Sequence, residues 1–251
     1  MTRPRIGFLI IGDEILSGRT AEKNLPALSE ILAEKGLAVD EARIVRDAPP
    51  QIAAPLRQMR AECGVVFTSG GIGPTHDDMT ADGVALAFGV AAEENKEAAA
   101  LLADFYARRG LEFTPARRRM ARAPKGAAIL KSEFPGAPGF VMENVFVCAG
   151  VPEIFRLMAA AACARLPEYP RRHSVVLRAD CPESELAAAL ADIQRRNPRL
   201  QIGSYPRADQ GAYYSRLVFG GEDKNAAAAA MREMADFLSR NGYRSSEIPE
   251  K

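Results

Sequence analysis

Short apolar runs alternate with amphipathic segments over the first two-thirds of the chain. The runs at 6–11 and 64–68 are apolar throughout, whereas 25–36 places its apolar residues on one helical face and ends at Gly36. Uninterrupted apolar runs are typical of strands covered on both faces, and strands that alternate with helices form right-handed βαβ units. The pattern therefore predicts an α/β domain whose mainly parallel sheet is covered by helices on both faces.

The other elements of this region follow from the same periodicities. We predict helices over 49–63, 79–89, 95–109, 114–124 and 151–166. We predict further strands over 37–45, 127–130, 139–142 and 144–150. The strand at 37–45 is less uniformly apolar than the others, which places it at the sheet edge or leaves it half exposed.

The pattern changes in the last third of the chain. It predicts a strand over 173–179, a helix over 182–197, strands over 200–205 and 213–221, and a helix over 223–242. This β-α-β-β-α order is typical of a small α+β domain of the ferredoxin-like or split βαβ type. We therefore predict two domains, 1–170 and 171–251, joined by the linker PEYPRR. The last residues, 245–251, are expected to fray.

Composition and charge narrow the classes of function. The 251 residues are 47% hydrophobic and 26% charged, which indicates a folded chain. The net charge of +1 creates no field that attracts nucleic acid or anionic membranes, and no stretch approaches the roughly 20 apolar residues of a membrane span. The four cysteines lie far apart without a CxxC pair, which predicts reduced, buried thiols. We expect a cytoplasmic protein without nucleic-acid or membrane partners.

The segment TSGGIGPTHDDMT, residues 68–80, is the first candidate for chemistry, and we call residues 70–79 the glycine loop. It directly follows a predicted strand, and parallel sheets bind ligands at the carboxyl ends of their strands. Its three glycines allow backbone N–H groups to approach an anion, and its two adjacent aspartates either cap the next helix or bind Mg²⁺. A tight turn also explains the glycines. No GK[ST] follows them, so the loop is not a Walker A motif.

Acidic residues also follow two other predicted strands. Asp13 and Glu14 come after the first strand, and Asp47 comes after the second. Because the carboxyl ends of parallel strands meet at one edge of a sheet, we expect these acids to share a crevice with Asp77 and Asp78 of the glycine loop. Three strand ends that deliver carboxylates to one place favour a functional cleft over a set of isolated helix caps.

Two segments resemble the signature sequences of a known family. GDEILSGRTAEKN (12–24) and SGGIGPTHDDMT (69–80) are similar to those of molybdopterin-binding, MoaB/Mog-like domains, in the form found at the N-terminus of CinA, the competence/damage-inducible protein A family. The matching positions are Gly12, Glu14, Leu16, Gly18 and Asn24, then Gly70, Gly71, Gly73, Pro74, Thr75, Asp77, Asp78 and Thr80. The resemblance continues in APGF and GVPEIF and covers residues 4–166. Ala149 stands where the family usually has a proline, whose loss is expected to loosen this loop.

The resemblance implies a three-layer α/β/α fold with a cleft for a phosphorylated nucleotide or pterin. CinA-type domains are associated with metal-dependent ADP-ribose pyrophosphatase activity, and Asp47 and Asp78 match aspartates of molybdopterin adenylyltransferases. On this basis we assign catalytic roles to Asp47, Asp78 and Glu14, and binding of Mg²⁺, Co²⁺ or Mn²⁺ to Asp47, Asp77 and Asp78. The other expected ligand-binding residues are Gly12, Asp13, Gly18, Asn24, Ser69, Gly70, Gly71, Gly73, Pro74, Thr75, Thr80, Gly150 and Pro152.

Three functions fit this resemblance. The first is metal-dependent hydrolysis of a pyrophosphate such as ADP-ribose. The second is binding or adenylylation of molybdopterin in molybdenum cofactor metabolism, and the third is non-catalytic nucleotide binding. Full-length CinA continues into a nicotinamide mononucleotide deamidase domain, whereas this chain ends at Lys251, so we expect no deamidase activity. Related proteins self-associate, and we expect a homo-oligomer.

Two further features have more than one interpretation. The basic cluster Arg117, Arg118, Arg119 and Arg122 either rims a phosphate site or forms an exposed helix face with salt bridges. His76 is close enough in sequence to the acids to act as an acid or base, but we interpret it as a solvated loop residue.

Overall fold

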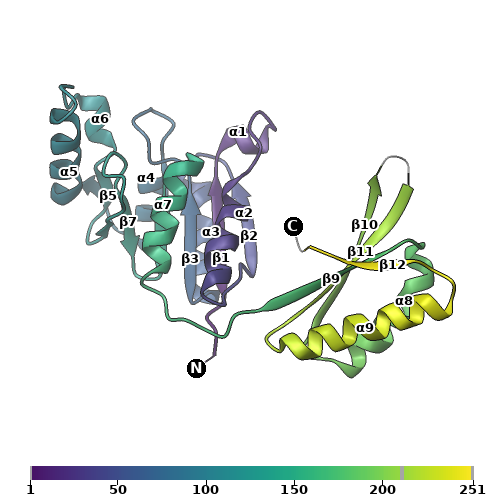
Figure 1. Ribbon diagram of the computed structural model, residues 1–251. Helices are drawn as coiled ribbons and strands as arrows, with labels where there is room; N and C mark the ends of the chain where they lie inside the picture. Colours follow the sequence, from purple (N-terminus) through teal and green to yellow (C-terminus); the bar gives the residue numbers. More distant parts are fainter. Residues whose placement is uncertain (1, 210–211, 250–251) are drawn as a thin grey trace. The chain divides into compact units, whose positions relative to one another are not determined.

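The computed structural model describes residues 2–209 and 212–249. The chain divides into two compact units, Met1–Tyr169 and Pro170–Lys251, and each is described separately (Figure 1). Among the described residues, no helix has the length and apolar character needed to cross a membrane.

The first unit contains fifteen helices and strands in the described part of the chain. In order they are β1 (Ile6–Ile11), α1 (Asp13–Leu16), α2 (Asn24–Glu34), β2 (Glu41–Val45), α3 (Pro49–Glu62), β3 (Val65–Ser69), α4 (Thr80–Phe88), β4 (Ala92–Glu94), α5 (Lys96–Ala107), α6 (Pro115–Arg119), β5 (Arg122–Pro124), β6 (Ala128–Leu130), β7 (Gly139–Met142), β8 (Val145–Cys148) and α7 (Pro152–Cys163).

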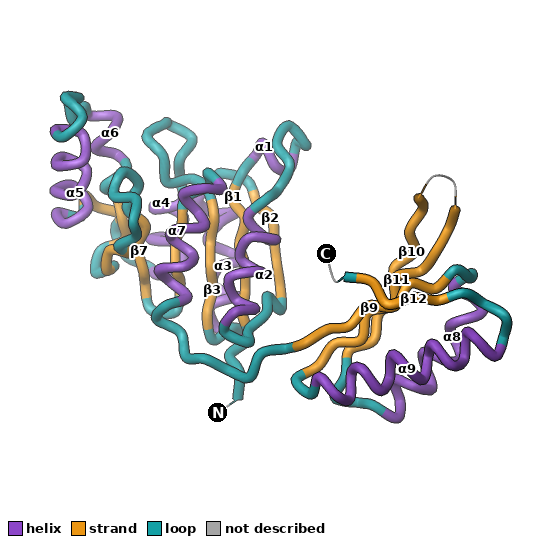
Figure 2. The backbone as a smooth tube through the Cα atoms, viewed as in Figure 1, coloured by secondary structure: helices purple, strands orange, loops and turns teal. Residues whose placement is uncertain are grey.

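The main sheet of this unit has six strands in the order β2-β1-β3-β8-β7-β6. The pairs β1–β2, β1–β3 and β3–β8 are parallel, whereas β7 and β6 are antiparallel additions at the other end. The expected mainly parallel sheet is therefore confirmed, and β2 is an edge strand. Figure 2 shows the loops that follow the parallel strands at the upper edge of the sheet.

Helices cover both faces of this sheet, which confirms the three-layer α/β/α architecture. Helices α3, α4 and α5 pack on one face, and α2 and α7 pack on the other (Figure 1). All six residues of β1 are buried, and because successive side chains of a strand point to opposite faces, Leu9 joins the first core and Phe8 the second. Phe8 also contacts Phe155 of α7, with ring centroids 5.6 Å apart.

Local periodicity did not predict the short strands β4 and β5 or the one-turn helix α1. Residues 114–124 were expected to be one helix, but α6 ends at Arg119 and residues 122–124 form β5. Strand β5 pairs antiparallel with β4, which places Arg122 opposite Glu94. Such a pairing depends on a partner about thirty residues away, so its signal is absent from the local pattern. The third element, α1, is a single turn directly after β1.

The second unit is an antiparallel sheet covered by two helices on one face. Its elements are β9 (His173–Ala179), α8 (Glu183–Arg196), β10 (Gln201–Asp209), β11 (Ala212–Gly221), α9 (Lys224–Arg240) and β12 (Ser245–Ile248). The strand order is β10-β11-β9-β12. The small α+β fold is confirmed, but the expected fraying of 245–251 is wrong over 245–248, where β12 pairs with β9 and places Ile248 opposite Val176. Residues 250–251 lie outside the described residues.

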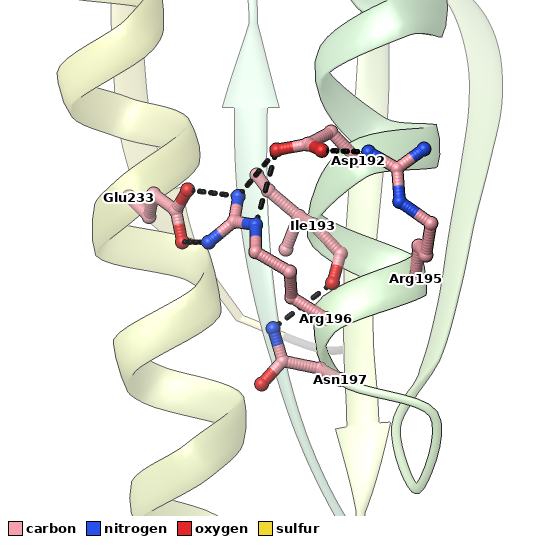
Figure 3. Close-up of polar contacts among 6 residues, drawn as sticks. All are labelled: Asp192, Ile193, Arg195, Arg196, Asn197 and Glu233. Carbon is pink, nitrogen blue, oxygen red and sulfur yellow. Dashed lines mark hydrogen bonds and ion pairs between the residues drawn. The ribbon is translucent and has the colours of Figure 1, made fainter.

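An exposed ion-pair network joins the two helices of the second unit. Arg196 of α8 lies between Asp192 of the same helix and Glu233 of α9, and it binds both carboxylates, as Figure 3 shows. The hydrogen bond from Arg196 holds the pKa of Asp192 below its usual range. Because these side chains are exposed, solvent screens the pairs, and they contribute little to stability.

All four cysteines are free and buried, as the sequence predicts. Burial raises the pKa of the Cys163 thiol to about 12 and raises that of Cys148 further. At neutral pH these thiols are protonated, so they pack as small apolar side chains and are poor nucleophiles.

Candidate functional site

The register of the parallel strands brings four strand ends to one edge of the sheet. Ile11 at the end of β1 lies opposite Val45 of β2, and Ser69 at the end of β3 lies opposite Ile10 and Cys148. The loops that follow β1, β2, β3 and β8 therefore start side by side. These loops carry the acids and the glycine loop, so the structure brings together what the sequence places more than 60 residues apart.

These loops enclose a cleft with two lobes. The glycine-loop lobe has a volume of about 500 Å³ and is lined by Ile11, Glu14, Thr20, Asp47, Gly70, Gly71, Ile72, Gly73, Pro74, Thr75, Asp77, Asp78, Met120, Ala137, Ala149, Gly150, Val151, Pro152 and Ile154. The Asn24 lobe has a volume of about 430 Å³ and is lined by Ile10, Ile11, Glu14, Ile15, Arg19, Thr20, Ala21, Glu22, Lys23, Asn24, Ser69, Gly150, Pro152 and Glu153. Ile11, Glu14, Thr20, Gly150 and Pro152 line both lobes.

The backbone of the glycine loop requires glycine at its first two positions. Gly70 and Gly71 have φ angles of 99° and 64°, in the region that L-residues rarely adopt. A Cβ atom at Gly70 would lie 2.1 Å from the carbonyl oxygen of Ile11, and one at Gly71 would lie 2.3 Å from Thr80 Oγ1. Thr80 ties the loop to α4, because its Oγ1 donates to the Gly70 carbonyl at 2.8 Å and its N–H donates to the Gly71 carbonyl at 2.9 Å.

Asp78 closes the glycine loop from inside. Its Oδ1 accepts the Gly73 N–H at 2.7 Å, and its Oδ2 accepts both the Thr75 N–H at 2.7 Å and the Thr75 hydroxyl at 2.6 Å. The interpretation of Asp77 or Asp78 as the cap of the following helix is wrong, since the N-cap of α4 is Met79 and no side chain caps it. Both oxygens of Asp78 are instead used to fold the loop.

The closed loop leaves backbone donors at its start. Within the described residues, the N–H groups of Gly71 and Ile72 donate to no other group, whereas the Gly73 N–H is held by Asp78. Gly71 and Ile72 both line the glycine-loop lobe. The N-terminus of α7 also faces this lobe through Val151, Pro152 and Ile154. Free amides and a helix N-terminus make this part of the cleft attractive to an anion.

Asp47 lies between these amides and the acids that follow β1. Its Oδ2 accepts the Asp13 N–H at 2.8 Å, and its Oδ1 comes within 3.2 Å of the position of a Cβ at Gly71. Burial raises the pKa of Asp47 above its ordinary value; the Asp13 N–H opposes this, and the charges of Glu14, Asp13 and Asp77 add to it. Negative charge is thus crowded here, an arrangement that a bound cation would relieve.

Replacing Asp47 with asparagine is expected to raise the Tm at pH 7, because asparagine still accepts the Asp13 N–H but carries no charge. The raised pKa means that folding favours the protonated carboxyl. The stability that the protonated Asp47 carboxyl contributes is complete below pH 3.8, the ordinary pKa of an aspartate, and is lost as the pH rises through the pKa of the folded state. Thermal unfolding of the wild type and of Asp47→Asn from pH 4 to pH 8 should therefore show that the gain in Tm of the variant becomes smaller as the pH falls. A gain of equal size at both ends would contradict the charge explanation.

The three proposed metal ligands do not form a preassembled site. The side chain of Asp77 is 68% exposed at the loop tip beside His76, which is 98% exposed, and both oxygens of Asp78 are engaged in the loop. No group of three His, Cys, Asp or Glu side chains within residues 2–209 and 212–249 is placed to hold a metal ion. Asp47 fits a cation as a single carboxylate ligand, an arrangement that Mg²⁺ tolerates when phosphate oxygens and water supply the rest.

Asn24 organises the second lobe. Its Nδ2 donates to Ser69 Oγ at 3.2 Å and to the Gly150 carbonyl at 2.8 Å, which links the loops after β3 and β8. The residue is only 5% exposed, and its Oδ1 has no partner among the described residues. The carboxylate of Glu22 accepts the N–H groups of Asn24 and Leu25 at the start of α2.

Most of the residues predicted from the sequence line this cleft, but four do not. Gly12, Asp13, Gly18 and Thr80 are absent from the lining of both lobes. Asp13 and Thr80 contribute through hydrogen bonds that position Asp47 and the glycine loop. Sequence reasoning missed lining residues such as Thr20 and Met120. Thr20 lies within the first signature segment, whereas nothing near Met120 in the sequence indicates a site.

Ala149, which stands where a proline was expected, does not leave its loop unsupported. Its N–H donates to the Sδ of Met158 in α7 at 3.1 Å, and the residue is buried. A proline has no N–H and would not make this contact. The expected loosening of this loop is therefore offset by the hydrogen bond from Ala149 to Met158, which a proline could not donate.

The first unit thus has a three-layer α/β/α fold whose cleft lies at the carboxyl edge of its parallel strands. A family model described as "Probable molybdopterin binding domain" matches residues 7–168, and one described as "FAD synthase, middle domain" matches residues 171–246. The chain belongs to this molybdopterin-binding, MoaB/Mog-like domain family, in its CinA-like form.

Individual relatives agree with this assignment. A CinA-like protein of Myxococcus xanthus is 33% identical over 240 residues, which cover 90% of this chain but only 56% of that protein. A protein of Aeropyrum pernix is 33% identical over 216 residues, which cover 82% of this chain and 81% of the relative. A crystal structure of the protein CinA, of unknown function, from Thermoplasma acidophilum covers 64% of this chain and 96% of that one, with 28% identity and a TM-score of 0.57.

Proposed function

We propose that the cleft binds a ligand with a diphosphate group and hydrolyses it, as in the cleavage of ADP-ribose. The observation that carries this proposal is the pair of free amides at Gly71 and Ile72 in the lobe that Asp47 also lines. Amides attract phosphate oxygens, and the crowded carboxylates at Asp47 require a cation when such an anion enters. An anion site and a cation ligand in one lobe suit a phosphate ester bound together with a divalent metal ion.

The residues divide the chemistry between them. In hydrolysis a water molecule attacks one phosphorus of the diphosphate, the bridging P–O bond breaks, AMP and ribose 5-phosphate form, and the proton of the water is released. The Gly71 and Ile72 amides bind the phosphate oxygens that gain charge. Glu14, which lines both lobes, orients the water and accepts its proton. Asp78 keeps the loop in its closed shape.

A divalent cation is assigned to Asp47 in this proposal. Bound there, Mg²⁺, Mn²⁺ or Co²⁺ would neutralise phosphate charge and lower the pKa of water. The remaining ligands would come from the substrate and solvent, since Asp78 is occupied by its own loop and Asp77 is exposed. The Asn24 lobe would accommodate the part of the ligand that lies beyond the phosphates, and the free Asn24 Oδ1 would accept a hydrogen bond after a small side-chain adjustment.

Hydrolysis of ADP-ribose by the full chain is the direct test. With Mg²⁺, Mn²⁺ or Co²⁺, we expect release of AMP, measured by chromatography. Glu14→Gln should lower kcat about 100-fold with little change in binding, because a general base contributes roughly this factor. Glu34→Gln makes the same change at the far end of α2 and should leave the rate unaltered. Equal rates for Glu14→Gln and the wild type would exclude Glu14 as the base.

A second function is favoured by the family to which the chain belongs. Its family model is described as molybdopterin-binding, and the Asn24 lobe offers space for a planar group next to the phosphate site. We therefore propose molybdopterin, with or without adenylylation, as the alternative ligand. Thermal stabilisation by molybdopterin together with no AMP release from ADP-ribose would favour this function, and stabilisation by ADP-ribose without turnover would favour a nucleotide-binding module.

A further inference from the structure

The basic cluster near α6 contains arginines with different surroundings. Arg117 stacks on the ring of Tyr106, with its guanidinium carbon 4.3 Å from the ring centroid, and also binds a backbone carbonyl. Arg118 stands over the ring of Phe113 at 5.4 Å and forms an ion pair with Glu94 at 3.3 Å. The protein's own aromatic rings and acids therefore already account for these two side chains.

The other two arginines face the glycine loop. Arg122 forms an ion pair with Asp82 of α4, but its Nε–H is buried and has no acceptor among the described residues. Arg119 is exposed, and within the described part of the chain it has neither an ion pair nor a hydrogen bond. The structure thus separates Arg119 from the rest of the cluster as a guanidinium with unused donors.

Both of these arginines line a small hollow that adjoins the cleft. The hollow is lined by Gly71, Ile72, Gly73, Asp78, Ala81, Asp82, Arg119, Met120 and Arg122. Five of these residues, namely Gly71, Ile72, Gly73, Asp78 and Met120, also line the glycine-loop lobe. Asp82 forms an ion pair with Arg122, and donors of the glycine loop bind both oxygens of Asp78. Among the described residues Arg119 has no such partner, and it lines the hollow together with Gly71 and Ile72.

We propose that Arg119 binds the second phosphate of a diphosphate ligand whose first phosphate is held by the Gly71 and Ile72 amides. This inference rests on the proposed function and assigns a residue to the second phosphate of its diphosphate ligand. A guanidinium presents a fork of donors that matches two phosphate oxygens, and its charge offsets the second negative group. The orphan Nε–H of Arg122 provides another donor on the same side of the hollow.

Two nucleotides that differ by one phosphate test this role. AMP and α,β-methylene-ADP would be titrated into the full chain in Mg²⁺ by calorimetry, since neither contains a hydrolysable diphosphate bridge. Arg119→Ala should weaken binding of α,β-methylene-ADP about tenfold, the usual effect of losing one charge-assisted phosphate contact, and binding of AMP less than twofold. Arg118→Ala removes an arginine one position away and should change neither affinity.

The outcomes separate this inference from the function on which it rests. If the wild type binds both nucleotides and Arg119→Ala binds them equally well, Arg119 has no phosphate role although the cleft remains a phosphate site. Equal weakening of both nucleotides would show that Arg119 acts on the first phosphate or on the fold, which also overturns the inference. If the wild type binds neither nucleotide, the proposed nucleotide function and the inference fail together. Partial recovery in Arg119→Lys would show that the charge contributes apart from the fork.

Discussion

Replacement of Gly70 with alanine is expected to lower the free energy of unfolding of the first unit by about 3 kcal/mol or more. Two causes combine. Alanine is strained at a φ of 99°, and its Cβ would lie 2.1 Å from the Ile11 carbonyl oxygen, an atom of the central strand β1 that has little freedom to move. Calorimetric unfolding of the full chain would measure the change, and the closed glycine loop should be lost with it.

Gly89→Ala is the matched control for this prediction. Gly89 is the C-cap residue that follows α4, with a φ of 69°, but a Cβ there would meet no atom within 4 Å. This variant therefore reports the backbone strain alone, which costs about 1 kcal/mol. If Gly70→Ala costs no more than Gly89→Ala, the close approach of the loop to β1 is not a constraint on the fold.

Loss of the Asp78 carboxylate is expected to weaken binding of a phosphorylated ligand by about 30-fold. Asp78→Ala removes the oxygen that accepts the Gly73 N–H and the oxygen that accepts both the N–H and the hydroxyl of Thr75. Without these hydrogen bonds the ligand has to order the loop when it binds. Hydrogen bonds to a charged group contribute about 2 kcal/mol, and a loss of this size corresponds to an affinity about 30-fold weaker. Titration with α,β-methylene-ADP would measure it, and circular dichroism would confirm that the rest of the unit stays folded.

The neighbouring carboxylate provides a matched comparison. The side chain of Asp77 is largely exposed at the loop tip. Asp77→Ala should therefore change the affinity by less than about threefold, the effect of an exposed charge. A large loss of Mg²⁺-dependent binding in this variant would instead show that Asp77 reaches the metal ion, as the residue types suggest. The pair of variants thus separates loop closure from metal binding.

The sequence was sufficient to predict a mainly parallel main sheet and the edge of that sheet at which the cleft lies. Uninterrupted apolar runs such as Ile6–Ile11 identify strands buried on both faces, because only such strands contain no polar position. In a parallel sheet the ends of these strands lie at one edge, so the acids and glycines that follow them had to meet there. The strand β12 escaped this reasoning, because its residues are mostly polar and its stability comes from pairing with β9.

By itself the sequence determined which loops meet, because chain order and strand direction place them at the carboxyl edge of the sheet. Only the tertiary structure decided what each of them does. Asp77 and Asp78 are adjacent and chemically identical, yet one is exposed while the other binds three donors of its own loop. Arg118 and Arg119 differ in the same way, since among the described residues only Arg118 contacts an acid and an aromatic ring. Such roles depend on side-chain direction and distant partners, which the three-dimensional packing of the chain sets.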